Sequence, residues 1–371
     1  MKKIVSLLII VLTLVGCTSN NNNSDNAADS YDRTTLLTNW ADNIIIPAYT
    51  NYQSKTQVLV ESTNTFTTTP TESNLQIMRA SWAEAYKAFQ TVMMYNFGKA
   101  EQIYIREKAN TYPTDIAGIN TNIASGTYNF ALLSQFSKQG FPALDYLING
   151  LGNSDGEILE FYTTNAQAAN YKKYITDLSN NLKSTIDLVV TDWNSGYRNT
   201  YISNKDNTTS GSVNVTINNF IKSIEKDIRA GKVGIPCGIF STGTLFPEKV
   251  EAYYKNDISK ELLNVSVQAN MDFFNGKHFG KTTSGESLKS YLDHLNATKN
   301  GQKLSDIINN QYSSIFTTND ALSNSLSQQV NSDNSKMLNS YDSLQQLVVF
   351  TKIDMMQALK INIDYVDSDG D

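Results

Sequence analysis

Two carboxylates near a helix break are the side chains best suited to hold a hard cation. Asp145 lies in the stretch Gly-Phe-Pro-Ala-Leu-Asp, and Asp115 follows a Pro-Thr pair. Carboxylate oxygens are the ligands that such cations prefer. Pro142 has no backbone N–H and disfavours the α conformation at Phe141, so one helix should end and another begin here. Asp145 would then lie in the first turn of the second helix, where the helix dipole favours a carboxylate.

Other catalytic chemistry has few candidates. His278 and His294 are the only histidines, and they lack the spacing of a zinc-binding helix. Cys237 lies in a Gly/Pro loop with no histidine nearby in the sequence, and no Gly-x-Ser-x-Gly elbow is present. We expect Cys237 to be a small buried side chain. The acidic residues at 367–371 resemble half of a calcium loop with a misplaced glycine, which favours a solvated tail.

The elements that position these side chains have helical periodicity. Thr69 is a candidate N-cap, followed by Pro70 at the first helical position and by Glu72. Apolar residues then recur every three or four positions up to residue 92. Further helical patterns cover 36–60 with a kink at Pro47, 128–138, 144–148, 166–193, 213–228, 258–274, 284–295, 304–312, 319–330 and 336–361. The sequence therefore predicts an all-α fold of two helical-bundle domains, residues 33–195 and 196–371, with about four helices each.

The first 32 residues have a different composition. Two lysines precede an apolar run that ends in Leu-Val-Gly-Cys, which resembles the lipobox of bacterial lipoproteins. We expect a signal peptide at 1–16, a lipidated Cys17 and a disordered tether over 17–32. Thr18 after the cysteine resembles lipoproteins that are passed to the outer membrane. The predicted location is therefore the cell envelope, with the lipid bilayer as a partner through Cys17.

The overall charge argues against nucleic acid as a partner. The formal net charge is −6, and the sequence contains no cluster of lysine and arginine residues.

Several stretches resemble the imelysin family of bacterial envelope proteins. Residues 140–147 resemble the family hallmark Gly-x-His-x-x-Glu, with Pro142 in place of the histidine and Asp145 in place of the glutamate. Residues 40–49, 82–98, 112–115 and the C-terminal stretch from Thr351 add to the similarity, which covers nearly all of the chain after about residue 33. The resemblance implies two helical bundles, a peptidase label and an association with iron uptake.

Metal-dependent hydrolysis needs three protein ligands and a base. Because the motif histidine is absent, we expect a non-enzymatic lipoprotein whose ligand lies in a cleft between the bundles. The ligand is unknown, with iron or another hard cation as candidates and iron-uptake proteins of the envelope as candidate partners. Candidate binding residues are Phe141, Pro142, Asp145, Asp115, Tyr95, Phe97, Arg79, Arg106, Pro236 and Asp354.

Within this set Asp145 and Asp115 are the metal candidates, and Arg79 or Arg106 is expected to pair with one of them. The Pro236 loop is expected to face the Pro142 break. The alternatives are a structural or protein-interaction lipoprotein whose site has decayed, and a peptidase. A polar pocket lined by both aspartates would favour binding, whereas a pocket filled by aromatic side chains would favour the interaction role.

Overall fold

The computed structural model describes residues 30–365 of the chain. The predicted signal peptide, Cys17 and the acidic end at 367–371 lie outside this range, as does most of the predicted tether. Residues 31–365 form one compact unit. Within the described range, no helix is both long enough and apolar enough to cross a bilayer.

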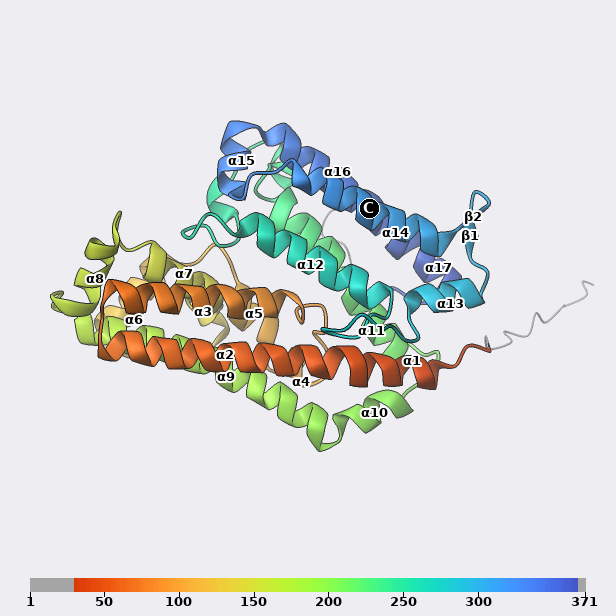
Figure 1. Ribbon diagram of the computed structural model, residues 1–371, viewed down its shortest axis with the longest axis horizontal. Helices are drawn as coiled ribbons and strands as arrows, with labels where there is room; N and C mark the ends of the chain where they lie inside the picture. Colours follow the sequence, from red (N-terminus) through yellow and green to blue (C-terminus); the bar gives the residue numbers. More distant parts are fainter. Residues whose placement is uncertain (1–29, 366–371) are drawn as a thin grey trace, which may run out of the picture. The chain divides into compact units, whose positions relative to one another are not determined.

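The described residues are mainly helical, which confirms the predicted all-α fold (Figure 1). The α-helices are α1 (Arg33–Asn39), α2 (Ile46–Thr68), α3 (Glu72–Gln90), α4 (Lys99–Gln102), α5 (Ile105–Asn110), α6 (Ile116–Ser125), α7 (Gly140–Asn149), α8 (Asp155–Thr163), α9 (Ala168–Asp192), α10 (Arg198–Ser203), α11 (Ser212–Lys222), α12 (Ser259–Phe274), α13 (Leu288–His294), α14 (Leu304–Asp320), α15 (Leu326–Ser332), α16 (Asn334–Val348) and α17 (Met356–Leu359). Strands β1 (Thr298–Lys299) and β2 (Gln302–Lys303) form a small antiparallel hairpin.

Several α-helices continue directly into π-helical segments, and short 3₁₀ segments occur within the longer connections. The π-helical segments are η1 (Trp40–Ile45), η3 (Trp193–Tyr197), η4 (Ser223–Gly234) and η7 (Val349–Met355). The 3₁₀ segments are η2 (Leu133–Lys138), η5 (Ile239–Ser241) and η6 (Pro247–Lys249). The predicted kink at Pro47 falls just after η1, at the start of α2.

Two groups of helices make up the folded body. Helices α2, α3, α5, α7 and α9 pack together in the first group, and α12, α14, α16 and η4 pack together in the second (Figure 1). Helix α12 also contacts α3, which joins the groups. The core of each group is formed by apolar side chains at helical spacing, as the sequence pattern predicts. The domain boundary at residues 195 and 196 remains a prediction.

Three local predictions were wrong. The N-cap of α3 is Thr71, whose side chain accepts from the backbone N–H of Asn74, so Pro70 precedes the helix. The stretch 128–138 contains only the 3₁₀ segment η2, and Leu133 within it is 65% exposed, so its apolar spacing reflects no buried helical face. Helix α7 already begins at Gly140, which places Asp145 in the second turn, where the helix dipole is weaker.

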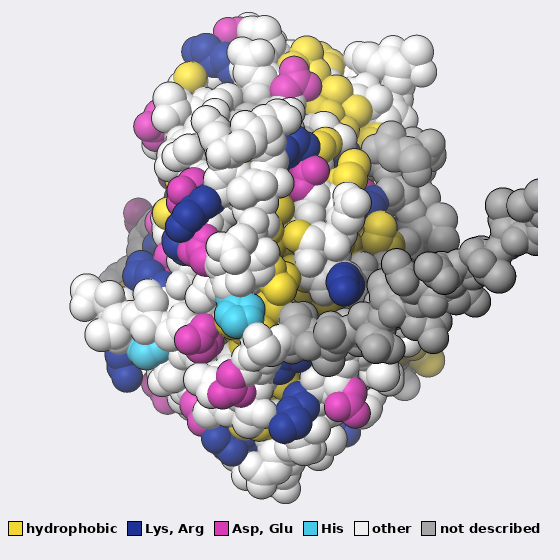
Figure 2. Space-filling view, turned by 90° about the vertical axis from the view of Figure 1, so that its right-hand side faces the viewer, with side chains coloured by type: hydrophobic (Ala, Val, Ile, Leu, Met, Phe, Trp, Pro, Cys, Tyr) yellow, Lys and Arg dark blue, Asp and Glu magenta, His cyan; other side chains and the backbone are white. Residues whose placement is uncertain are grey.

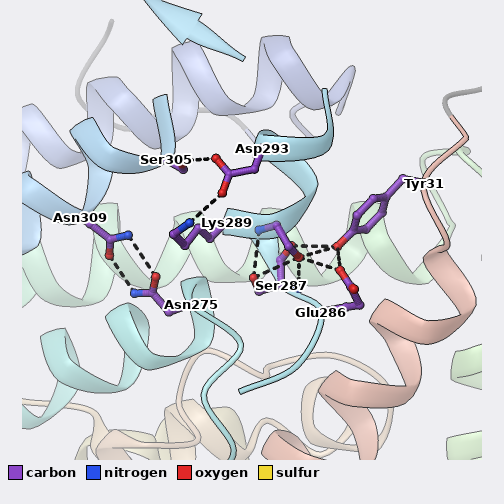
Figure 3. A network of polar contacts seen from close by, with 9 residues as sticks. Tyr31, Asn275, Glu286, Ser287, Lys289, Asp293, Ser305 and Asn309 are labelled. Atoms are coloured by element: carbon purple, nitrogen blue, oxygen red, sulfur yellow. Dashed lines mark hydrogen bonds and ion pairs between the residues drawn. The ribbon is translucent and has the colours of Figure 1, made fainter. Parts of the chain in front are cut away.

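Tyr31 attaches the start of the folded body to the segment before α13 (Figure 3). Its hydroxyl donates to the Glu286 carboxylate at 2.5 Å and lies 2.6 Å from the Ser290 hydroxyl. Its ring stacks on Tyr291 with a centroid distance of 4.1 Å. The next residue, Asp32, caps α1. The predicted tether range therefore overlaps the folded body at its last two residues.

Candidate functional site

The motif helix α7 is held in the core at its first turn. Gly140 has a φ of +77°, and a Cβ there would lie 2.3 Å from the backbone oxygen of Ala109, so only glycine permits this close approach of α5 and α7. The Phe141 ring is fully buried and stacks on Tyr86 at 4.5 Å. Its backbone carbonyl accepts a hydrogen bond from the Trp82 indole. Phe141 is thus a core residue and not a cavity wall.

Asp145 joins the motif helix to the segment that precedes α12. Its side chain accepts hydrogen bonds from the backbone N–H groups of Tyr254 and Lys255, each at 2.9 Å, and from the Asn149 amide at 2.9 Å. Gly150 permits the approach of this segment, because a Cβ there would lie 2.4 Å from the Tyr254 ring. The carboxylate therefore acts as a latch between the two groups of helices.

The electrostatic environment of this latch is dominated by burial. Asp145 is 1% exposed, and burial raises the pKa of its carboxyl to about 7, against the opposing effect of its three N–H donors. No ion pair to Asp145 is present among the described residues. Burial removes this carboxylate from water, and the neutral N–H donors stabilise its negative charge less than the lost water did.

A small cavity of about 200 Å³ lies beside the latch. Pro142 and Asp145 line it on the motif side, and residues between Glu248 and Tyr254 line the opposite side. Tyr112 and Pro113 complete the wall. The position taken by the histidine in the hallmark motif is thus a proline in the wall of this cavity, with no polar side-chain atom to offer a ligand.

A larger cavity of about 480 Å³ lies on the other side of the Tyr112–Pro113 loop. Residues of α3, α5 and the following loop form one wall, and residues of η4 and η6 form the other. Its lining is Phe89, Met93, Arg106, Glu107, Asn110, Thr111, Tyr112, Pro113, Lys226, Asp227, Gly231, Lys232, Ile235 and Lys249. We call this space the large chamber. Its volume is within the usual range for small-molecule sites.

A cluster of buried polar side chains extends from the wall of the large chamber into the interior. Lys232 is 2% exposed and forms an ion pair with Glu251, which is 1% exposed. Gln90 links the two, accepting from Lys232 at 2.9 Å and donating to Glu251 at 3.1 Å. Asn110 donates to Glu251 at 2.6 Å and accepts from the Tyr86 hydroxyl. This cluster again joins the two groups of helices, because Gln90 and Asn110 belong to α3 and α5.

Arg106 carries the second ion-pair group of the chamber. Its guanidinium lies 3.3 Å from the Asp227 carboxylate on η4 and 3.0 Å from the neighbouring Glu107. Burial raises the pKa of Asp227, and the charge of Arg106 opposes this shift. Burial and the nearby acids Glu251 and Asp227 also hold the pKa of Tyr112 well above its ordinary value.

The remaining predicted site residues lie elsewhere. Tyr95 and Phe97 are each 2% exposed; the Tyr95 ring contacts Tyr49 and Phe273, and the Phe97 ring stacks on Tyr201. Tyr95 also lines a separate cavity of about 180 Å³ beside α12.

The predicted arginine–aspartate pairs were wrong. Arg79 forms its ion pair with Asp155 at 2.7 Å, and Arg106 pairs with Asp227 and Glu107. Arg79 reaches Asp155 at the start of α8, and Arg106 reaches Asp227 on η4. Asp145 instead points toward the backbone ahead of α12. Asp354 pairs with Lys299 in the β-hairpin at 2.5 Å, which is also away from both cavities.

Two further expectations about the cleft were wrong. Asp115 does not line the small cavity; it caps α6 by accepting from the N–H of Gly118 at 2.9 Å. Pro236 is buried and does not face Pro142, because the segment from Glu248 to Tyr254 occupies that place. Ile235 is the residue of that loop that lines the large chamber.

The comparison with known families gives the assignment. The model of the imelysin family matches residues 45–349, which is most of the chain. The chain belongs to the imelysin family. This confirms the resemblance found in the sequence motifs.

One similar protein is known as an iron-regulated protein. Iron-regulated protein A of Synechococcus elongatus is 25% identical over 118 residues, which is 30% of this chain and 32% of that protein. The match thus spans about a third of that relative.

Solved structures of two proteins have the same fold. An imelysin-like protein from Psychrobacter arcticum has a TM-score of 0.69 at 16% identity, covering 90% of this chain and 97% of that one. A putative iron-regulated protein A precursor from Parabacteroides distasonis has a TM-score of 0.71 at 14% identity, covering 88% and 94%.

The motif position of this imelysin does not fit a resident metal ion. Both oxygens of Asp145 already accept N–H donors, and Asp115 is not part of the same cavity. Residues 30–365 contain no group of three or more histidine, cysteine or acidic side chains arranged to hold a metal. His278 and His294 do not add ligands: His278 lies 2.8 Å from the Thr283 hydroxyl, and His294 packs against Tyr31.

The described residues on the face drawn in Figure 2 form no patch of only acidic or only basic side chains. Acidic and basic side chains are interspersed on this face, and the two histidines lie apart. The cleft between the two groups of helices is therefore the best candidate site of the described residues.

Sequence reasoning missed most of the chamber. One signal was present: Glu225, Arg229 and Lys232 follow each other at helical spacing beside an apolar stripe, so charged side chains had to enter the interior. Nothing in the sequence around Glu251 or Lys249 indicates their role, because η6 and the segment that follows it reach the chamber only through contacts with residues distant in the sequence.

Proposed function

We propose that this imelysin is a non-enzymatic binding protein of the cell envelope, linked to iron uptake, that holds its ligand in the cleft between its two groups of helices. The observation that carries the proposal is the large chamber, about 480 Å³ in volume, whose wall includes charged side chains from both groups. Clefts between packed units are favoured places for ligands. The iron link comes from two similar proteins, iron-regulated protein A of Synechococcus elongatus and the putative iron-regulated protein A precursor of Parabacteroides distasonis.

The motif supports a binding role over a catalytic one. A catalytic carboxylate has to reach a substrate, but the oxygens of Asp145 are engaged by three N–H donors. Cys237 is buried, and burial raises the pKa of its thiol to about 11, which opposes a role as nucleophile. Peptidase activity therefore has no support from these two side chains.

Membrane attachment through Cys17 completes the proposal. The lipobox-like sequence lies outside the described residues, and the folded body begins at Tyr31. Some thirteen residues separate the two, enough for a chain to span roughly 45 Å when extended. Labelling cells with a radioactive fatty acid tests this: we expect label in the natural chain and none in Cys17→Ala. Equal labelling of both would contradict the anchor.

One observation favours the alternative, a protein-interaction role. Large apolar side chains near the cleft are exposed, among them Ile235 and Ile239 at 38% each, Phe240 at 43% and Tyr253 at 38%. Such side chains are common at interfaces between proteins. The alternative predicts that the chamber stays empty and that these residues contact a partner.

A matched pair of variants separates the two roles. Ile235→Trp places a large ring at the chamber wall, whereas Ile239→Trp makes the same change at an equally exposed position that does not line it. The purified full chain would be titrated by calorimetry with ferrous, ferric, zinc and calcium ions and with haem. We expect at least one probe to bind with a 1:1 stoichiometry, and its affinity to fall in Ile235→Trp alone. Equal loss in both variants, or no binding of any probe, would overturn the chamber as the ligand site.

A further inference from the structure

Most charged groups in the wall of the large chamber are paired with one another. Asp227 and Glu107 both pair with Arg106, and Glu251 pairs with Lys232. Lys226 and Lys249 also line the chamber, from η4 and η6. The pairs hold Arg106 and Lys232 within the wall, so Lys249 is the cation to consider for a ligand.

Lys249 is the cation best placed to meet a ligand. Its ammonium lies 3.7 Å from the centroid of the Phe246 ring, and within residues 30–365 no carboxylate is within ion-pair distance of it. A cation over an aromatic face keeps its N–H donors available on the other side. Lys226 lines the same chamber from η4, with its ammonium 5.1 Å from the Tyr365 ring centroid.

The rest of the lining is largely apolar. Phe89 and Met93 of the first group, the Tyr112 and Pro113 side chains, and Ile235 of the second group all face the space. A ligand that fills about 480 Å³ against these walls gains most by burying an apolar body. The ammonium of Lys249 favours one negative group on that body, because the acids Glu107 and Asp227 in the wall would repel a multiply charged one.

We propose that the large chamber binds a small organic carboxylate, with its apolar body against Phe89, Tyr112 and Ile235 and its carboxylate toward Lys249. This inference rests on the proposed binding function and specifies the ligand class. A lysine ammonium over a ring acts as a point charge for a carboxylate. The neighbouring small cavity, which holds no cation in its lining, takes no part in this recognition.

The test uses benzoate as the probe, benzamide as its uncharged counterpart, and inorganic phosphate as the multiply charged anion. Each is titrated by calorimetry into the purified full chain, up to roughly 10 mM because ligands of so few atoms bind weakly. We expect saturable benzoate binding, about tenfold weaker binding of benzamide, and a benzoate affinity that falls as salt is raised.

Two lysine variants locate the charge. Lys249→Gln should weaken benzoate about tenfold, the effect of losing a charged hydrogen bond. Lys255→Gln is the matched control, because this lysine pairs with Asp257 at 2.8 Å and does not line the chamber. The benzoate affinity of this variant should stay within about twofold of the natural chain. Equal binding of benzoate and benzamide, an unchanged affinity in Lys249→Gln, or no benzoate binding would each overturn the inference.

The Ile235→Trp variant distinguishes this inference from the proposed function. If another probe binds and is lost in Ile235→Trp while benzoate does not bind, the chamber is a ligand site and the carboxylate class is wrong. If benzoate depends on Lys249 but binds Ile235→Trp as well as the natural chain, the carboxylate lies outside the chamber, which also overturns the inference. Phosphate binding that replaces benzoate binding would assign a phosphate site instead.

Discussion

Asp145 and Glu251 are both buried carboxylates that join the two groups of helices, but they have different partners. Asp145 accepts only from neutral N–H groups, whereas Glu251 pairs with the ammonium of Lys232 and accepts from Gln90 and Asn110. The small cavity beside Asp145 has no cation in its lining, and the large chamber beside Glu251 has four. The motif side therefore stabilises the fold, and the chamber side is where we propose that a ligand binds.

The largest expected effect concerns the buried ion pair between Lys232 and Glu251. In Lys232→Met, the Glu251 carboxylate stays buried without its cation, so we expect the free energy of unfolding to fall by about 3–5 kcal/mol. Urea denaturation measures this. Lys55→Met is the control, because its pair with Glu84 is exposed and should contribute under about 1 kcal/mol. Similar losses in both variants would show that Glu251 does not depend on Lys232.

The next effect concerns the latch. Asp145→Asn replaces one of two accepting oxygens by an NH₂ group that faces a backbone N–H, so we expect a loss of about 1–3 kcal/mol. Asp115→Asn should cost under about 0.5 kcal/mol, because asparagine caps a helix as well as aspartate does. Urea denaturation of the two variants measures the difference. A smaller loss in Asp145→Asn than in Asp115→Asn would contradict the latch.

The latch also predicts a pH dependence. The Asp145 pKa is raised to about 7 in the fold, against about 3.9 in an unfolded chain. Between these values unfolding releases a proton, so the stabilising contribution is present in acid and is lost as the pH rises through 7. The stability of the natural chain relative to Asp145→Asn should fall from about pH 5 to about pH 8, by at most about 1.4 kcal/mol per pH unit. A stability difference that is constant or increases over this range would contradict the raised pKa.

The smallest effect is expected at a site predicted from the sequence alone. Asp354→Asn removes a partly exposed ion pair with Lys299, away from both cavities. We expect a loss below about 1 kcal/mol in urea denaturation and no change in ligand affinity. A loss of affinity in this variant would place the site elsewhere in the molecule.

The fold could be predicted from the sequence because its signals are local. Apolar stripes at helical spacing gave the helices, and the break before Pro142 gave the start of α7. The cap of α3 was misplaced by two residues because Thr69 and Thr71 flank the same proline and both suit an N-cap.

The site could be predicted only in part, because it depends on contacts between distant segments. The sequence indicated Pro142 and Asp145, which do share a cavity, and Arg106, which lines the other one. It gave no signal for Lys249, since this residue of the short segment η6 reaches the chamber only through the tertiary fold, more than one hundred residues after Arg106. Tyr95 and Phe97 are expected at the cleft because they follow the end of the long helix, but their packing is that of core residues.

Calorimetric titration of benzoate into Asp145→Asn and Ile235→Trp, side by side with the natural chain, tests most directly whether ligand binding belongs to the large chamber. We predict that Asp145→Asn keeps its affinity within about twofold, because its hydrogen bonds hold the backbone and not the ligand, whereas Ile235→Trp loses binding. Loss of binding in Asp145→Asn together with normal binding in Ile235→Trp would contradict this and return the site to the motif cavity.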